Sequence, residues 1–161
     1  MIRIDKLNKY YGGRGASQVH AVNDVSLTLP DSGMVAIFGK SGCGKTTLLN
    51  MVGGLDKASS GEVLIDGKKI TPDSDSARNL KVGYIFQNYN LSERMSVYDN
   101  VAFSMHVVGA SKQQIRKKVS HVLSVVGLSG KARSKPAELS GGEQQRVALA
   151  RALVHNPDLV I

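Results

Sequence analysis

Short apolar runs separated by glycine-containing turns dominate the first half of the chain. Residues 2–7 and 21–29 predict β-strands, the second because apolar and polar side chains alternate along it. The continuous apolar runs 34–38 and 82–86 are typical of strands buried on both faces of a parallel sheet. Residues 60–65 predict a strand that an Asp66-Gly67 turn closes. The pattern therefore predicts a sheet-rich first half.

Helical periodicity dominates the second half. Residues 111–126 carry one apolar stripe and open with Ser111 and Gln114, the pair expected of a capping box. Ser140 and Glu143 form a second such pair, which opens a helix predicted to run to about residue 155. Polar residues 71–79 indicate a surface loop or a short helix, and residues 159–161 begin another apolar strand. The alternation of strands and helices is that of an α/β protein.

Composition narrows the class of protein. A chain of 161 residues has the length of one domain, and 42% hydrophobic with 21% charged residues is usual for a globular chain. Without a run of 18 apolar residues, no segment is expected to span a membrane. The net charge of +8 raises the question of nucleic acid, but the basic residues are scattered, which favours a solvated surface. No nucleic-acid partner is expected.

A glycine-rich loop lies between the run 34–38 and a predicted helix that begins near Lys45. Its sequence matches the phosphate-binding pattern GxxxxGK[ST], and the strand–loop–helix context supports the match. Glycines expose successive backbone N–H groups, the helix adds its N-terminal dipole, and lysine and threonine serve phosphate and Mg²⁺. The predicted ATP-binding residues here are Gly39, Lys40, Ser41, Gly42, Cys43, Gly44, Lys45, Thr46 and Thr47. The sequence offers no general base that would activate the Cys43 thiol, so Cys43 is not expected to be a catalytic nucleophile.

A second motif lies downstream and reads Leu139-Ser140-Gly141-Gly142-Glu143-Gln144-Gln145-Arg146. Two glycines in a first helical turn are unfavourable unless a ligand approaches the backbone closely. This octapeptide resembles the LSGGQ signature of the ATP-binding subunits of ABC transporters, and the resemblance runs from about Ile4 to the last residue. It implies a P-loop NTPase (RecA-like) parallel sheet core, an N-terminal antiparallel β subdomain and an α-helical signature subdomain. The implied boundaries are about 1–88, 89–150 and 151–161.

The resemblance also implies roles for residues outside the P-loop. Tyr11 is similar to the aromatic residue that stacks on adenine, although Tyr10 is adjacent and also aromatic. Gln87 resembles the glutamine that binds Mg²⁺ and water, so Thr46 and Gln87 are the implied metal ligands. The implied signature contacts, made with ATP on a second ATP-binding domain in a head-to-tail dimer, come from Ser140, Gly141, Gly142 and Glu143.

The resemblance places the hydrolytic residues beyond this sequence. In the family an Asp-Glu pair follows an Asn-Pro motif and an apolar strand, and a histidine follows later. Here Asn156-Pro157 and the strand are present, and the sequence stops at Ile161. No catalytic residue is therefore expected within residues 1–161, and the C-terminal part of the core is expected to be absent. Such a fragment would bind nucleotide without turning it over, and would self-associate through unpaired strands.

These features imply an ATP-binding subunit that couples Mg-ATP hydrolysis to transport on the cytoplasmic side of a membrane. Its partner would be a transmembrane permease, separate or fused, and the lipoprotein-release and macrolide-export branch looks closest. The alternative is a non-transport ABC ATPase of the translation or DNA-repair type. Only about ninety residues, without heptads, separate the two motifs, which disfavours the coiled-coil repair members. The signature argues against a plain P-loop kinase or GTPase. The transported substrate is not encoded here.

Overall fold

The computed structural model describes residues 1–12, 18–74 and 82–161. The chain divides into two compact units, Met1–Asn79 and Leu80–Ile161, and each is described by itself. Within the described residues, the first unit holds an antiparallel sheet and helix α1, and the second holds a helical bundle and a short parallel pair of strands. The family resemblance implied this combination of antiparallel, parallel and helical parts.

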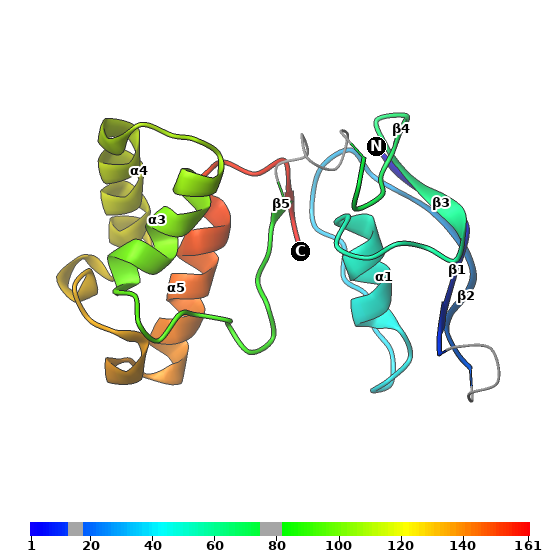
Figure 1. The fold of residues 1–161 in the computed structure, drawn as a ribbon, viewed down its shortest axis with the longest axis horizontal. Coiled ribbons are helices and arrows are strands. Elements are labelled where there is room, and N and C mark those ends of the chain that lie inside the picture. Colours follow the sequence, from blue (N-terminus) through cyan, green and yellow to red (C-terminus); the bar gives the residue numbers. More distant parts are fainter. Residues whose placement is uncertain (13–17, 75–81) are drawn as a thin grey trace. The chain divides into compact units, whose positions relative to one another are not determined.

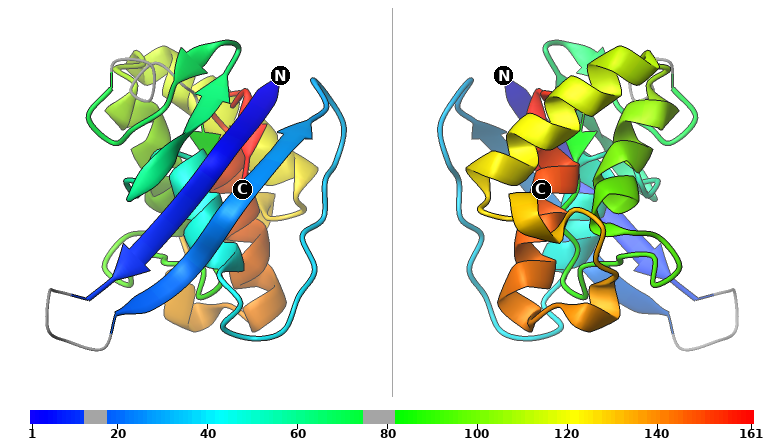
Figure 2. Two further views of the ribbon diagram at one scale, coloured as in Figure 1. Left: turned by 90° about the vertical axis from the view of Figure 1, so that its right-hand side faces the viewer. Right: turned by 90° about the vertical axis from the view of Figure 1, so that its left-hand side faces the viewer.

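An antiparallel sheet forms the first unit (Figures 1 and 2). Its strands are β1 (Ile2–Tyr11), β2 (Val19–Leu29), β3 (Ser60–Ile65) and β4 (Lys68–Lys69), in the order β2-β1-β3-β4. Helix α1 (Lys45–Val52) lies against one face of this sheet (Figure 2). The buried apolar side chains of the sheet and helix form the core of the unit: Ile4, Leu7, Val22, Leu48, Met51, Val52, Val63 and Ile70.

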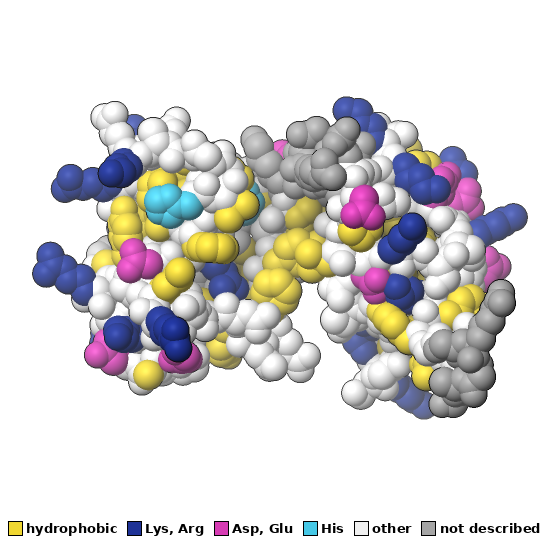
Figure 3. Space-filling model, viewed as in Figure 1, with side chains coloured by type: hydrophobic (Ala, Val, Ile, Leu, Met, Phe, Trp, Pro, Cys, Tyr) yellow, Lys and Arg dark blue, Asp and Glu magenta, His cyan; other side chains and the backbone are white. Residues whose placement is uncertain are grey.

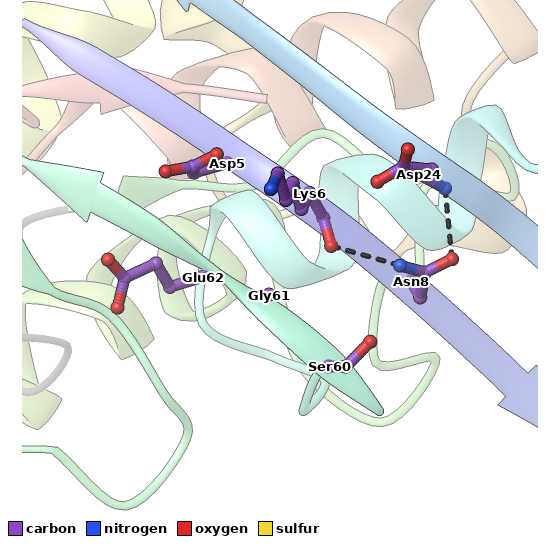
Figure 4. A pocket seen from close by; sticks show the side chains of 7 residues that line it. All are labelled: Asp5, Lys6, Asn8, Asp24, Ser60, Gly61 and Glu62. Carbon is purple, nitrogen blue, oxygen red and sulfur yellow. Dashed lines mark hydrogen bonds between the residues drawn. The ribbon is translucent and has the colours of Figure 1, made fainter.

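Irregular backbone interrupts the pairing of β1 with both neighbours. Lys6 and Asp24 have positive φ angles of 44° and 45°, which residues other than glycine rarely adopt. The Asn8 amide holds both sites, since its nitrogen donates to the Lys6 carbonyl (3.0 Å) and its oxygen accepts from the Asp24 N–H (2.9 Å) (Figure 4). A Cβ on Gly61 would lie 2.2 Å from the Lys6 carbonyl oxygen, so β3 needs glycine there. A shallow depression of about 520 Å³ results, and no P-loop residue lines it.

The hairpin between β3 and β4 has the turn that the sequence predicts. Asp66 and Gly67 take φ angles of 49° and 75°, and two left-handed residues match the right-handed twist of the flanking strands. The prediction of an Asp-Gly turn is confirmed.

The described part of the second unit, residues 82–161, is built mainly from the helices α3 (Val97–Val107), α4 (Lys112–Val125) and α5 (Gly141–Leu153) (Figure 1). The 3₁₀ turns η1 (Ser129–Lys131) and η2 (Pro136–Glu138) connect α4 to α5. The buried apolar side chains of the helices and their connections form one hydrophobic cluster: Val97, Val101, Ala102, Met105, Ile115, Val119, Val122, Leu123, Leu128, Leu139, Val147, Ala150 and Val154. Both predicted capping boxes are present, at Ser111/Gln114 and at Ser140/Glu143.

A parallel pair of strands completes this unit: β5 (Val82–Gly83) and β6 (Leu159–Val160). Ile161 continues the ladder, because its N–H donates to Gly83 and its carbonyl accepts from Ile85. Gly83 packs against α5 so closely that a Cβ would lie 2.4 Å from the Ala152 carbonyl oxygen. The predicted strand at 159–161 is confirmed. The one predicted at 82–86 is shorter than expected, since only Val82–Gly83 form a strand and Ile85 adds a single backbone hydrogen bond to Ile161.

Two elements differ from the sequence prediction. The predicted buried strand 34–38 is wrong: among the described residues neither sheet includes it, and Met34 and Phe38 are 96% and 91% exposed. An apolar run forms a strand only when neighbouring backbones supply its hydrogen bonds. Helix α3 was not predicted, although the Ser96 hydroxyl caps it. Residues 75–79 of the predicted loop lie outside the described residues.

Candidate nucleotide-binding site

The glycine-rich loop and the start of α1 form the candidate phosphate site. Residues 41–44 turn tightly, and Gly44 is the N-cap of α1 in a left-handed conformation with φ of 91°. Among the described residues no side chain caps α1, and its first turn carries no acidic group. The first N–H groups of a helix have no partner within the helix, and its dipole favours an anion there. The loop therefore presents an N-terminus suited to phosphate.

Lys45 places a cation inside this loop. Its ammonium donates to the carbonyl oxygens of Gly39 (2.9 Å) and Lys40 (2.8 Å) and lies 3.7 Å from the Cys43 sulfur. Lysine is a compact point charge with three donors, a form that serves phosphate oxygens well. The second cation of the loop, Lys40, is exposed. The loop thus combines two positive charges with the helix dipole.

Gly44 is required by packing as well as by its backbone angle. A Cβ at this position would lie 2.0 Å from the Ala21 carbonyl oxygen of β2. At Gly42, whose φ is 78°, no described atom lies within 4 Å of the same point. Gly44 therefore fixes how closely the P-loop approaches the sheet, whereas the space beside Gly42 is open.

Tyr11 lies at the end of β1 and is held by its hydroxyl group. The hydroxyl donates to Asp56 Oδ2 at 2.6 Å and contacts the Thr47 hydroxyl on α1. Asp56 Oδ1 accepts from the Lys9 ammonium, also at 2.6 Å. The neighbouring Tyr10 is engaged differently, because its ring stacks on that of His20 with centroids 4.0 Å apart. The two adjacent tyrosines thus have distinct surroundings.

Protonation states follow from these contacts. The hydrogen bond to Asp56, aided by burial, raises the pKa of Tyr11, so the phenol stays protonated at neutral pH. Burial alone would raise the pKa of Asp56, but hydrogen bonds from Lys9, Tyr11 and the Lys57 backbone outweigh it and lower that pKa. Asp56 is therefore ionised at neutral pH, and its contribution to stability is lost only as the pH falls through its lowered pKa.

Gln87 belongs to the second unit, where it is exposed beyond the end of the β5 pairing. The loop that follows it is strained, with φ angles of 58° at Tyr89 and 48° at Asn90. The Arg151 guanidinium on α5 donates to both of their carbonyl oxygens, each at 2.6 Å. Burial lowers the pKa of Arg151. One side chain from α5 therefore fixes the backbone beside Gln87.

The signature octapeptide forms the start of α5. Glu143 accepts hydrogen bonds from the Ser140 N–H (2.8 Å) and hydroxyl (2.9 Å), and these contacts lower the Glu143 pKa. A Cβ on Gly141 would meet no described atom within 4 Å, and one on Gly142 would meet only Arg146, at 3.9 Å. Both glycines are exposed. Nothing within the described chain requires glycine at either position.

The structure brings some predicted site residues together. Tyr11, Thr47 and the P-loop share the first unit, whereas Gln87 shares the second unit with Ser140–Glu143. Lys9, Asp56 and Arg151 were not predicted as parts of a site. They act through contacts between residues 45 to 62 positions apart, for which the sequence carries no local signal.

Within residues 1–12, 18–74 and 82–161, no cluster of three or more His, Cys, Asp or Glu side chains is placed to hold a metal. The same residues include no helix long and apolar enough to cross a membrane. Figure 3 shows basic side chains scattered over the visible face of the helical unit, with acidic ones between them.

Fold and loop together define a P-loop nucleotide-binding protein, and the comparisons with known proteins specify its family. The ABC transporter family model matches residues 22–161. The sulfate/thiosulfate import ATP-binding protein CysA of Neisseria meningitidis is 44% identical over 99% of this chain and 44% of that protein. The macrolide export ATP-binding/permease protein MacB of Mannheimia succiniciproducens is 41% identical over 100% of this chain and 26% of that protein. The chain belongs to the ABC transporter family.

Structural similarity agrees with this assignment. The ATP-binding cassette MJ0796, solved as a dimer in a post-hydrolysis state with ADP and Pi, has a TM-score of 0.88 and 36% identity. The alignment covers 99% of this chain and 72% of that one. The chain spans less than half the length of the curated relatives named above. They include importers and a macrolide exporter, so these identities do not separate import from export.

Proposed function

We propose that this chain binds the triphosphate of Mg-ATP at the loop Gly39–Thr46. The observation that carries the proposal is the uncapped N-terminus of α1 with the Lys45 ammonium inside the loop. The loop offers backbone N–H groups and the cations Lys40 and Lys45, which suits phosphate oxygens. The ATP-binding names of the relatives support the same ligand.

The adenine would be held by a residue outside the loop, and the metal by the last residue of the loop together with one residue outside it. Tyr11 is the proposed base-stacking residue, because its ring is 41% exposed at the edge of the P-loop unit. Thr46 and Gln87 are the proposed protein ligands of Mg²⁺, which takes most of its remaining ligands from phosphate and water. Bound Mg²⁺ would neutralise charge on the phosphate oxygens.

The signature residues are proposed to act on a second copy of the domain. Ser140, Gly141, Gly142 and Glu143 form the start of α5, where both glycines are exposed and the chain itself leaves room for side chains at them. Glycine is costly in a helix, so a partner that approaches the backbone from outside gives a reason for it. The dimeric state of MJ0796 supports a head-to-tail pair of ATP-binding domains.

For the whole protein, we infer an ATPase that drives transport through a transmembrane permease, subunit or fused domain, on the cytoplasmic side of a membrane. Support comes from the relatives, which are named as ATP-binding proteins of import and export systems. The alternative, a translation or repair ATPase, finds no support among them. Direction of transport and substrate belong to the permease.

Labelling of Cys43 tests nucleotide binding without any mutation, because the chain has a single cysteine. The Cys43 sulfur is exposed and lies 3.7 Å from the Lys45 ammonium. Saturating Mg-ATP is expected to slow maleimide labelling by about tenfold, since the phosphates would cover the loop. Mass spectrometry of the intact chain gives the rate.

The control for labelling moves the thiol to another exposed position of the same unit. Lys68→Cys, carried in a Cys43→Ser background, should label at the same rate with and without Mg-ATP. Equal labelling of Cys43 in both conditions would contradict phosphate binding at this loop.

A further inference from the structure

We propose that Asp56 is a positioning residue that fixes the Tyr11 ring for contact with the nucleotide base. The inference rests on the proposed function, because it assigns a role in the same site. It begins from the contacts of one carboxylate that no motif in the sequence marks.

Both oxygens of Asp56 are committed. Oδ2 accepts from the Tyr11 hydroxyl at 2.6 Å, while Oδ1 accepts from the Lys9 ammonium at 2.6 Å and the Lys57 N–H at 2.7 Å. Lys9 also donates to the Lys57 carbonyl at 2.7 Å. The side chains of Lys9 and Asp56 are only 12% and 24% exposed, so this ion pair is poorly screened by water. The Tyr11 hydroxyl is therefore hydrogen-bonded to a carboxylate that is itself held by an ion pair and a backbone N–H group.

The same support leaves one side of the ring available. The Lys9 ammonium lies 4.9 Å from the ring centroid, which occupies one face with a cation. Tyr11 as a whole remains 41% exposed, so part of its surface stays accessible. Tyr10 has a similar exposed fraction, 39%, but the His20 ring already stacks on its ring. Of the two adjacent tyrosines, Tyr11 is the one built to receive a flat apolar ligand.

Asp56 also ties the ring to the helix that would bind phosphate. The Asp56 and Leu55 N–H groups both donate to the Asn50 carbonyl of α1, at 3.2 Å and 2.8 Å. The Tyr11 hydroxyl contacts Thr47 on the same helix. Ring and phosphate loop are thus held at a fixed separation, as a nucleotide with a base at one end and phosphates at the other requires.

The Tyr11 hydroxyl is already hydrogen-bonded to Asp56 and contacts Thr47, so Tyr11 can contact a nucleotide base only with the face of its ring. Stacking is tolerant of base identity, because every base presents a π-face. This contact should therefore favour ATP and GTP alike over a base-free triphosphate.

The test compares two ligands by calorimetry, Mg-ATP and Mg-tripolyphosphate, which lacks the base. Asp56→Ala is expected to weaken Mg-ATP about tenfold, the effect of about one stacked base, and to leave Mg-tripolyphosphate within about twofold. Tyr11→Phe keeps the ring and removes only its hydrogen bonds, and should weaken Mg-ATP by a smaller factor. Asp66→Asn removes an exposed carboxylate in the β3–β4 turn and keeps a residue that tolerates the left-handed backbone there, so it is the control and should change neither ligand.

A double variant separates positioning from a general loss of structure. In a Tyr11→Ala background, Asp56→Ala should have no further effect on Mg-ATP. The inference is overturned if Asp56→Ala weakens both ligands equally, or weakens Mg-ATP as much without Tyr11 as with it. A third outcome overturns this inference alone: the wild-type chain binds both ligands, and neither Asp56→Ala nor Tyr11→Phe changes the affinity for Mg-ATP. Wild-type chain that binds neither ligand overturns the proposed function and this inference together.

Discussion

Lys45→Ala is expected to weaken Mg-ATP binding by about 100-fold, or about 3 kcal/mol. The Lys45 ammonium is already inside the loop, held by two backbone carbonyls at 2.8 to 2.9 Å. A phosphate bound on the same loop would gain a charge-assisted contact to a cation that needs little reorganisation. Alanine removes that contact and leaves the backbone donors alone. Titration with a fluorescent ATP analogue measures the difference.

Lys40→Ala separates this contact from the overall field of the loop. It removes the same charge from an exposed neighbouring position, and water and salt screen its effect. A loss of about threefold or less is expected. Equal losses for the two variants would mean that Lys45 acts through net charge, and a Lys45→Ala variant with wild-type affinity would place the phosphates elsewhere.

Gly44→Ala is expected to destabilise the chain by about 3 kcal/mol or more. Its φ of 91° is unfavourable for alanine, and its Cβ would lie 2.0 Å from the Ala21 carbonyl oxygen. Because that atom belongs to the backbone of β2, relief requires the P-loop and the sheet to separate. Urea denaturation of the two proteins measures the change in unfolding free energy.

Gly42→Ala is the matched control, since Gly42 also has a positive φ, 78°, but has open space around its Cβ position. Conformational strain alone should cost it about 1 to 2 kcal/mol. The difference between the two variants therefore reports the packing of the loop on β2. Equal losses would contradict the close approach seen at Gly44.

Features that depend on a few neighbouring residues could be predicted from the sequence. The caps Ser111/Gln114 and Ser140/Glu143 and the Asp66-Gly67 turn each join residues at most three positions apart. The P-loop belongs to the same class, because its donors come from consecutive residues. Such interactions form wherever the local sequence allows them, so their residue patterns are informative.

Features that depend on distant partners could not be predicted. Residues 34–38 have the composition of a buried strand, but a strand also needs paired neighbours, which periodicity does not reveal. Helix α3 is a different case, because its signal is local. Its buried residues Val97, Val101 and Met105 lie on one face and a capping serine stands at position 96, a pattern from which the helix could have been predicted. The support of Tyr11 by Asp56 spans 45 positions and became visible only in the structure.

Amide NMR spectra of the ¹⁵N-labelled chain during a titration with Mg-ATP test the central claim most directly. The account predicts saturable shifts of the Gly42, Gly44, Lys45 and Thr46 amides, which form the loop and the first turn of α1. Mg-tripolyphosphate should move the same signals, since the phosphates alone reach them. The assignment of this loop as the nucleotide site would be contradicted if these amide signals did not shift at saturating Mg-ATP, whether or not other signals in the spectrum shifted.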